Sequence, residues 1–139
     1  MALNRAVFFV CVTLFAAVQA EERFKGRLSP VPIDARMRAN VTGAGSVSAV
    51  LTGTRLSISG TFGGLAGPAT VARLHQGVAT GVRGPALSEL TISKAPSGAL
   101  SGTVTLTAEQ VENLKKGKFY IQIHSEKAPE GNLWGWLLR

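Results

Sequence analysis

Alternation of apolar and polar residues at every second position restricts the fold of this chain more than any other feature. It is clearest near the C-terminus, in the run Phe119, Tyr120, Ile121, Gln122, Ile123 and His124. A β-strand turns successive side chains to opposite faces, so this run predicts a strand with one apolar face and one polar face. Pro129 and Gly131 then predict a turn, and residues 133–138 predict a second strand.

The same pattern predicts six further strands. They cover residues 23–28, 46–51, 55–62, 70–75, 87–92 and 100–106. The second and third of these form a hairpin around Thr52-Gly53-Thr54. We therefore expect an all-β fold, an antiparallel β-sandwich or barrel of about seven or eight short strands.

One segment departs from the alternation and predicts a short helix over about residues 108–116. Thr107 precedes it and Gln110 follows three residues later, which is the spacing of a capping box. Val111 and Leu114 give the helix one apolar stripe, and Gly117 can adopt the left-handed conformation that ends many helices.

The N-terminus is typical of a secretory signal peptide over residues 1–20. A positive start at Arg5 precedes an apolar run over residues 6–17, and Val18 and Ala20 are small residues at the −3 and −1 positions of a cleavage site. Cleavage would leave a single domain, residues 21–139. The alternative is an uncleaved N-terminal helix that tethers an accessory subunit, although the apolar run is shorter than the ~20 residues of a membrane span.

Composition excludes several classes of function. The single cysteine, Cys11, lies in the predicted signal peptide, so residues 21–139 contain no disulfide and no thiol ligand or nucleophile. The net charge is +7, but the basic residues are scattered apart from Lys115, Lys116 and Lys118. We therefore expect no nucleic-acid partner, and either a solvated basic surface or a weak attraction to acidic glycans, lipids or a partner protein.

Four motifs resemble those of the chordin-type (CHRD) domain family. Residues 106–111 are similar to the family's L-T-x-x-Q, and residues 116–125 to its G-x-x-Y-V-N-V-H-T. Residues 129–135 resemble P-G-G-E-I-R-G, and residues 72–77 resemble A-H-I-H-G. The order and spacing of the motifs match over about residues 24–138. The resemblance implies a secreted or periplasmic β-sandwich, and it implies no agreed activity.

The sequence departs from the family pattern at several positions. Arg73 replaces the first histidine of H-x-H, and Asn132 and Trp134 replace the glutamate and arginine of the last hairpin. The acidic motif that is typical of the family near its start is replaced by residues 28–32, which contain no glutamate.

Six residues are candidates for binding a partner. They are Arg73, His75, Tyr120, His124, Trp134 and Trp136. Trp134 and Trp136 share one face of the last strand. Facing outward they would form a stacking platform for a glycan or a protein, and facing inward they would belong to the core.

Metal binding is an alternative for two of these residues, His75 and His124, because two imidazoles suit copper or zinc. A stable site has three or four ligands, however, and the positive charge of Arg73 beside His75 would oppose a cation. The other interpretation is that both histidines hydrogen-bond loop backbone and that the protein has no cofactor. Asn40, in Asn40-Val41-Thr42, is a glycosylation acceptor if the source is eukaryotic.

The sequence contains no hydrolase motif of the G-x-S-x-G type, and few acids lie near the histidines. We therefore expect a secreted, extracellular or periplasmic binding module without enzymatic activity. Its partner would be a protein or a glycan, and no segment would span a membrane once the signal peptide is removed. The copper- or zinc-binding periplasmic protein and the tethered accessory subunit are the alternatives.

The pattern of residues 1–20 predicts cleavage between Ala20 and Glu21. Mass spectrometry of the exported protein should therefore find Glu21 at the N-terminus. An intact Met1, with the protein retained in membranes after a carbonate wash, would contradict cleavage and favour the tethered form.

Overall fold

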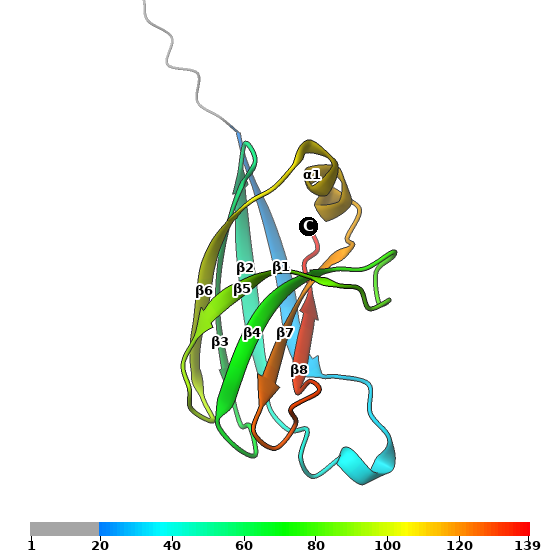
Figure 1. The fold of residues 1–139 in the computed structure, drawn as a ribbon. Helices are drawn as coiled ribbons and strands as arrows, with labels where there is room; N and C mark the ends of the chain where they lie inside the picture. The colour runs from blue at the N-terminus through cyan, green and yellow to red at the C-terminus, as the bar shows by residue number, and fades with distance from the viewer. Residues whose placement is uncertain (1–19) are drawn as a thin grey trace, which may run out of the picture.

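The alternating segments form the strands of a closed antiparallel barrel (Figure 1). The computed structural model describes residues 20–139, so the predicted signal peptide lies, apart from Ala20, outside the described residues. The strands are β1 (Glu21–Pro30), β2 (Ala44–Thr52), β3 (Arg55–Gly63), β4 (Ala69–Gln76), β5 (Ala86–Ile92), β6 (Gly98–Thr105), β7 (Phe119–Ser125) and β8 (Leu133–Trp136). A 3₁₀ helix, η1 (Ala35–Met37), and one α-helix, α1 (Ala108–Lys115), complete the described part of the chain.

The order of the strands around the barrel is β1-β2-β3-β6-β5-β4-β7-β8, and β8 returns to β1. This confirms the all-β prediction with one short helix, and it resolves the choice between sandwich and barrel in favour of a closed barrel. Closure removes the unpaired edge strands through which an open sheet can pair with another chain.

The inward side chains are those that the alternation predicted. Phe119, Ile121 and Ile123 of β7 are fully buried, and Leu56 and Ile58 of β3 are buried. Together with inward residues of the other strands they form one continuous core inside the barrel. Burial of each such side chain stabilises the fold by roughly 1.5–3 kcal/mol, which is the main source of stability in a domain without a disulfide.

The barrel closes where β8 meets β1, and glycine is required there on both strands. β8 pairs with β1 through Ser29–Trp134 and Pro30–Leu133 only. A Cβ atom on Gly26 would lie 2.7 Å from the carbonyl oxygen of Trp136, and one on Gly135 would lie 3.0 Å from the carbonyl oxygen of Arg27. The two backbones therefore approach too closely for side chains at these inward positions.

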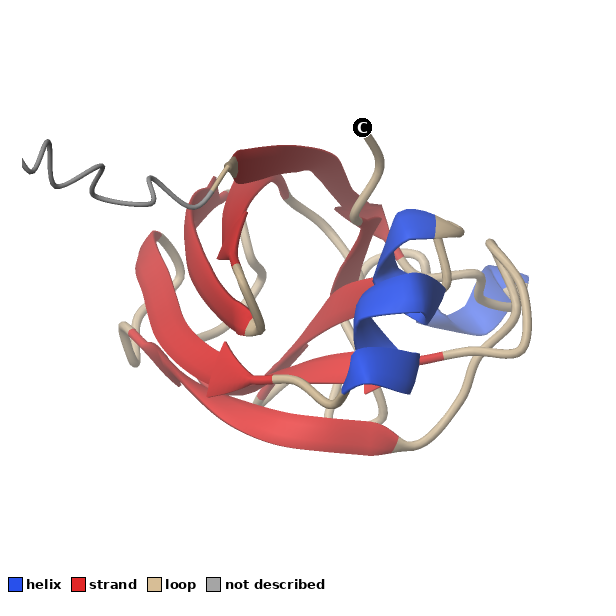
Figure 2. Ribbon diagram, turned by 90° about the horizontal axis from the view of Figure 1, so that it is seen from above, coloured by secondary structure: helices blue, strands red, loops and turns tan. Residues whose placement is uncertain are grey.

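Helix α1 lies over one end of the barrel (Figure 2). Thr107 and Gln110 form the predicted capping box, in which each side chain accepts a hydrogen bond from the other residue's backbone N–H. Val111 and Leu114 are buried against the core, which confirms the predicted apolar stripe. Lys115 at the helix end makes an ion pair with Glu22 of β1, 3.5 Å between Nζ and Oε1.

The segment that joins β1 to β2 lies at the other end of the barrel (Figure 1). Val31 and Val41 pack there against Ala128 in a second, smaller apolar cluster, with Met37 and Trp134 beside it. Asp34 caps η1 by accepting a hydrogen bond from the N–H of Arg36. Asn40, the residue of the glycosylation sequon, lies in this segment and is half-buried.

Within residues 20–139, no helix has both the length and the apolar character needed to cross a bilayer.

The capping box predicts a measurable loss of stability in Thr107→Ala. The variant leaves the N–H of Gln110 without its partner, and the free energy of unfolding should fall by about 1 kcal/mol. Urea denaturation measures the change, with Thr103→Ala, an exposed threonine of β6, as the control. A midpoint equal to that of the unmodified protein would contradict the capping role.

Candidate functional site

The outer surface of β4, β7 and β8 gathers all six of the candidate binding residues. We call it the aromatic face and define it by Arg73, His75, Tyr120, Gln122, His124, Trp134 and Trp136. Strand register places six of these seven residues in two rows across the sheet, and His124 lies beyond them on β7. Arg73, Gln122 and Trp134 form one row, and His75, Tyr120 and Trp136 form the other.

The core determines that the two tryptophans face outward. Leu133, Gly135 and Leu137 are buried inside the barrel. Because neighbouring residues of a strand face opposite sides, Trp134 and Trp136 must lie on the outer surface, where each is half-buried. This settles the question that the sequence left open.

Four rings of the aromatic face pack together. Tyr120 stacks on His75, with ring centroids 4.7 Å apart, and it also packs against Trp136, with centroids 4.5 Å apart. Trp134 meets both Tyr120 and Trp136 edge-on, at 5.8 and 5.6 Å. Such pairs each contribute about 0.5–1.5 kcal/mol beyond the area that they bury.

The loop over residues 77–85 folds across this cluster and covers part of it. The Tyr120 hydroxyl donates to the carbonyl oxygen of Gly84 and accepts from the N–H of Gly84, at 3.1 Å in both cases. Arg83 places its guanidinium carbon 5.6 Å from the centre of a Trp134 ring, a cation–π contact. Tyr120 is consequently only 1 % exposed and cannot touch a partner while the loop stays in place.

Arg83 and Gln122 belong to the site but were not among the sequence candidates. The glycines of the 77–85 loop could have indicated that the loop packs closely against the protein, because a Cβ atom at Gly84 would overlap the backbone of Gln76 and Gly77. A loop that needs glycine for close packing lies against the protein rather than extending into solvent. Gln122 was predicted on the polar face, and the structure buries it there to 5 % exposure.

The aromatic face contains two buried ring nitrogens that have no hydrogen-bond partner among residues 20–139, Nε2 of His75 and Nε1 of Trp136. His75 Nδ1 lies 3.0 Å from the Gly84 carbonyl oxygen. A carbonyl only accepts, so Nδ1 carries the proton and Nε2 of the neutral ring is an acceptor. The site therefore offers one acceptor, His75 Nε2, and one donor, Trp136 Nε1–H.

Burial lowers the pKa of His75 below the usual value of 6.5, and the charges of His124 and Arg73 lower it further. The hydrogen bond with Gly84 opposes this shift by raising the pKa. Desolvation is the largest of these causes, so the structure favours the neutral imidazole.

His124 shares the face with His75 but does not share a site with it. His75 is opposite Tyr120 in the register, and His124 lies four residues further along β7, a separation of about 13 Å along the strand. Arg73 and Gln122 occupy the row between the two histidines. His124 Nδ1 donates to the carbonyl oxygen of Pro129 at 2.9 Å, and its Nε2 faces the Gln122 amide nitrogen at 3.3 Å.

These positions do not bring metal ligands together. Among the residues that the structure describes, no three histidine, cysteine, aspartate or glutamate side chains converge on one point.

Asn132 fixes the turn that leads into Trp134. Its side-chain oxygen accepts from the hydroxyl of Ser125 at 2.7 Å, and its amide nitrogen donates to the carbonyl oxygen of Thr42 at 2.9 Å. Asn132 and Ser125 are both fully buried. Asn132 therefore ties the β7–β8 turn to the segment that precedes β2.

The lowered pKa of His75 predicts a loss of stability in mild acid. A histidine whose pKa is depressed in the folded state stabilises the fold above its unfolded pKa, near 6.5, and that contribution is lost as pH falls through the lower folded value. Urea midpoints measured from pH 7.5 down to about pH 5 should therefore decline. His75→Gln should flatten this decline, whereas the control His124→Gln should keep most of it, because burial, the largest cause of the lowered His75 pKa, is unaffected. An equal slope in His75→Gln and the unmodified protein would contradict the assignment.

Comparison with known proteins gives a family and no closer relative. The family model described as the CHRD domain matches residues 30–137. Neither the curated proteins nor the solved structures contain a significant match. The family match spans nearly all of the described barrel and includes β4, β7 and β8, which carry the aromatic face. This chain belongs to the CHRD domain family.

Proposed function

We propose that the protein is a secreted or periplasmic binding module without enzymatic activity, and that its partner binds the aromatic face. The observation that carries this proposal is the outward placement of Trp134 and Trp136, both half-buried, around Tyr120 and beside Arg73 and Arg83. Large aromatic side chains next to arginine are enriched where proteins bind partners.

A glycan is the partner class that the chemistry of the face favours. Sugar rings stack on tryptophan through their apolar C–H faces, and their hydroxyl groups both donate and accept hydrogen bonds. Nε1 of Trp136 and Nε2 of His75, the two buried ring nitrogens without a partner in the described chain, would become available to such hydroxyls if the 77–85 loop moved aside. Arg73 and Arg83 would favour an acidic glycan over a neutral one. A protein partner on the same face is the alternative.

The proposal includes neither catalysis nor a resident metal. A catalytic histidine is usually oriented by a carboxylate, whereas His75 and His124 each donate from Nδ1 to a backbone carbonyl. His75 on β4 lies opposite Tyr120, four residues before His124 on β7, and this offset argues against a copper or zinc ion shared by the two histidines. Export is supported by the signal-peptide pattern of residues 1–20.

Glycan arrays carrying neutral and acidic saccharides test the proposal. We expect binding to acidic glycans that is weakened by salt, because exposed charges are screened. Trp134→Ala should weaken it about three- to tenfold, since one aromatic stacking contact contributes about 0.5–1.5 kcal/mol. The exposed β3 variant Ser57→Ala is the control.

Two outcomes would contradict parts of the proposal. Equal binding by Trp134→Ala, Arg73→Gln and the unmodified protein would remove the aromatic face as the binding site. A silent array, combined with a protein partner that the same variants release, would replace the glycan by a protein and leave the face in place.

A further inference from the structure

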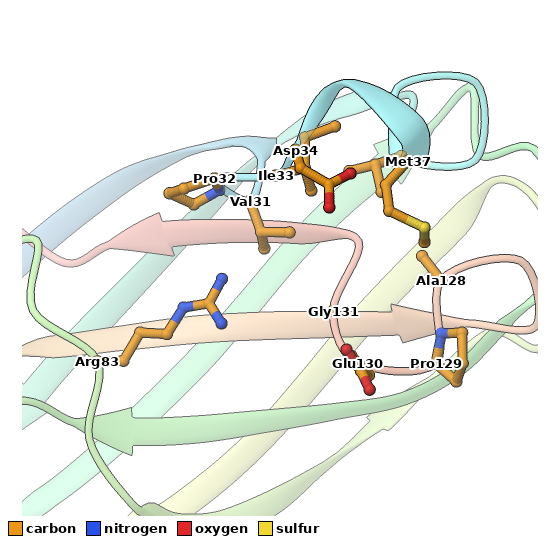
Figure 3. Close-up of a pocket in the computed structure, with 11 residues that line it drawn as sticks. Val31, Pro32, Ile33, Asp34, Met37, Arg83, Ala128, Pro129, Glu130 and Gly131 are labelled. Atoms are coloured by element: carbon orange, nitrogen blue, oxygen red, sulfur yellow. The ribbon is translucent and has the colours of Figure 1, made fainter.

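A cavity of about 450 Å³ lies beside the aromatic face, at the end of the barrel opposite α1 (Figure 3). One side is formed by the segment that follows β1, the other by residues 128–131 of the β7–β8 turn, and Arg83 reaches it from the 77–85 loop. Ligand pockets in proteins usually measure about 300–1,000 Å³, so this cavity can hold a small molecule or a short peptide.

The walls of the cavity are apolar over much of their area. Val31, Met37, Val41 and Ala128 line it, and they belong to the smaller apolar cluster described above. Ile33 also lines the cavity and is 40 % exposed, which makes it one of the few exposed large apolar residues in the described chain. An apolar group bound here would remove Ile33 and its neighbours from water, which favours binding.

Charged groups of opposite sign lie at different places in the cavity. The guanidinium of Arg83 points into it from one end, and beyond it the carboxylates of Asp34 and Glu130 lie on two different walls, Asp34 beside η1 and Glu130 on the β7–β8 turn (Figure 3). None of these three residues takes part in the ion pairs found within residues 20–139, which join Arg23 to Glu21, Lys115 to Glu22, Lys115 to Glu112 and Arg139 to Glu22. The contact of Arg83 with Trp134 keeps its guanidinium in place without a carboxylate partner.

A ligand that matches this arrangement has an anionic end, a cationic end and an apolar body between them. A single amino acid does not fit, because its ammonium and carboxylate groups are bonded to the same carbon. A peptide of two or three residues separates its free termini by roughly 7–10 Å when extended. Its side chains can then lie against Val31, Met37 and Ile33.

We propose that the cavity binds a short zwitterionic peptide, with its C-terminal carboxylate at Arg83 and its N-terminal ammonium at Asp34 and Glu130. Apolar side chains of the peptide pack against the wall between these ends. The cavity shares Arg83 with the aromatic face, but the proposal does not depend on which partner binds that face. It adds Arg83, Asp34 and Glu130 as residues that determine which ligand is accepted.

Calorimetry with the tripeptide Ala-Leu-Ala and the purified protein tests the proposal, and free leucine, N-acetylated tripeptide and C-amidated tripeptide are the comparison ligands. We expect saturable binding of the free tripeptide in the micromolar to millimolar range. Each blocked form and free leucine should bind at least about tenfold more weakly, because a hydrogen bond to a charged group contributes about 1.5–3 kcal/mol. Tryptophan emission should change on binding, since Arg83 lies over Trp134.

Variants identify which charged side chain binds which terminus of the peptide. Arg83→Gln should lower the affinity for the free tripeptide at least tenfold, and it should bind the amidated form as well as the unmodified protein does. The double variant Asp34→Asn/Glu130→Gln should also bind the free tripeptide at least tenfold more weakly, and it should bind the acetylated form as well as the unmodified protein does. Asparagine at position 34 preserves the cap of η1. The matched controls are Arg55→Gln and Glu109→Gln, which change exposed residues outside the cavity lining.

Several results would overturn the proposal. They are the absence of saturable binding by the free tripeptide in the millimolar range, equal binding of the blocked forms or of free leucine, and equal weakening by the control variants. None of these results depends on Trp134 or Arg73 in the glycan assay, so failure here is distinguishable from failure of the proposed function.

Discussion

The structure depends on the close approach of β8 to β1, which closes the barrel. β8 contains four residues, and it pairs with β7 on one side and β1 on the other. Gly26 and Gly135 leave room for the two backbones, and the side chains of Val47 and Leu28 lie beside Gly26 and Gly135 respectively. A side chain at Gly26 would require the two backbones to move apart, and one at Gly135 would require its neighbours to shift.

The same constraint produces the aromatic face. Because Leu133, Gly135 and Leu137 point into the barrel, Trp134 and Trp136 between them must point outward. Pairing with β7 then sets Trp134 opposite Gln122 and Trp136 opposite Tyr120. The ring cluster is thus a consequence of how the core is packed, and the 77–85 loop adds to it by bonding Tyr120 through Gly84.

Local patterns were sufficient to predict the strands, their inward faces and the capping box, because these features depend on residues close in sequence. The strand order was not predictable in this way, since β3 lies beside β6 and β4 beside β7 through contacts between distant segments. The candidates on β4, β7 and β8 were found by alternation and by resemblance to the family. Arg83 was missed because a loop residue carries no periodic signal. The cavity was missed because residues near 31–41, Arg83 and residues 128–131 come together only in the folded barrel.

The seam between the first and last strands also governs when the protein can finish folding. Leu138 exchanges backbone hydrogen bonds with Lys25, so a residue that follows β8 extends the pairing of the last strand of the barrel with the first. During synthesis β1 and β2 can pair early, but the free edge of β1 has no partner until β8 has left the ribosome. Until the two strands meet, the core between them stays open, so resistance to unfolding develops only after the first and last strands of the barrel have paired.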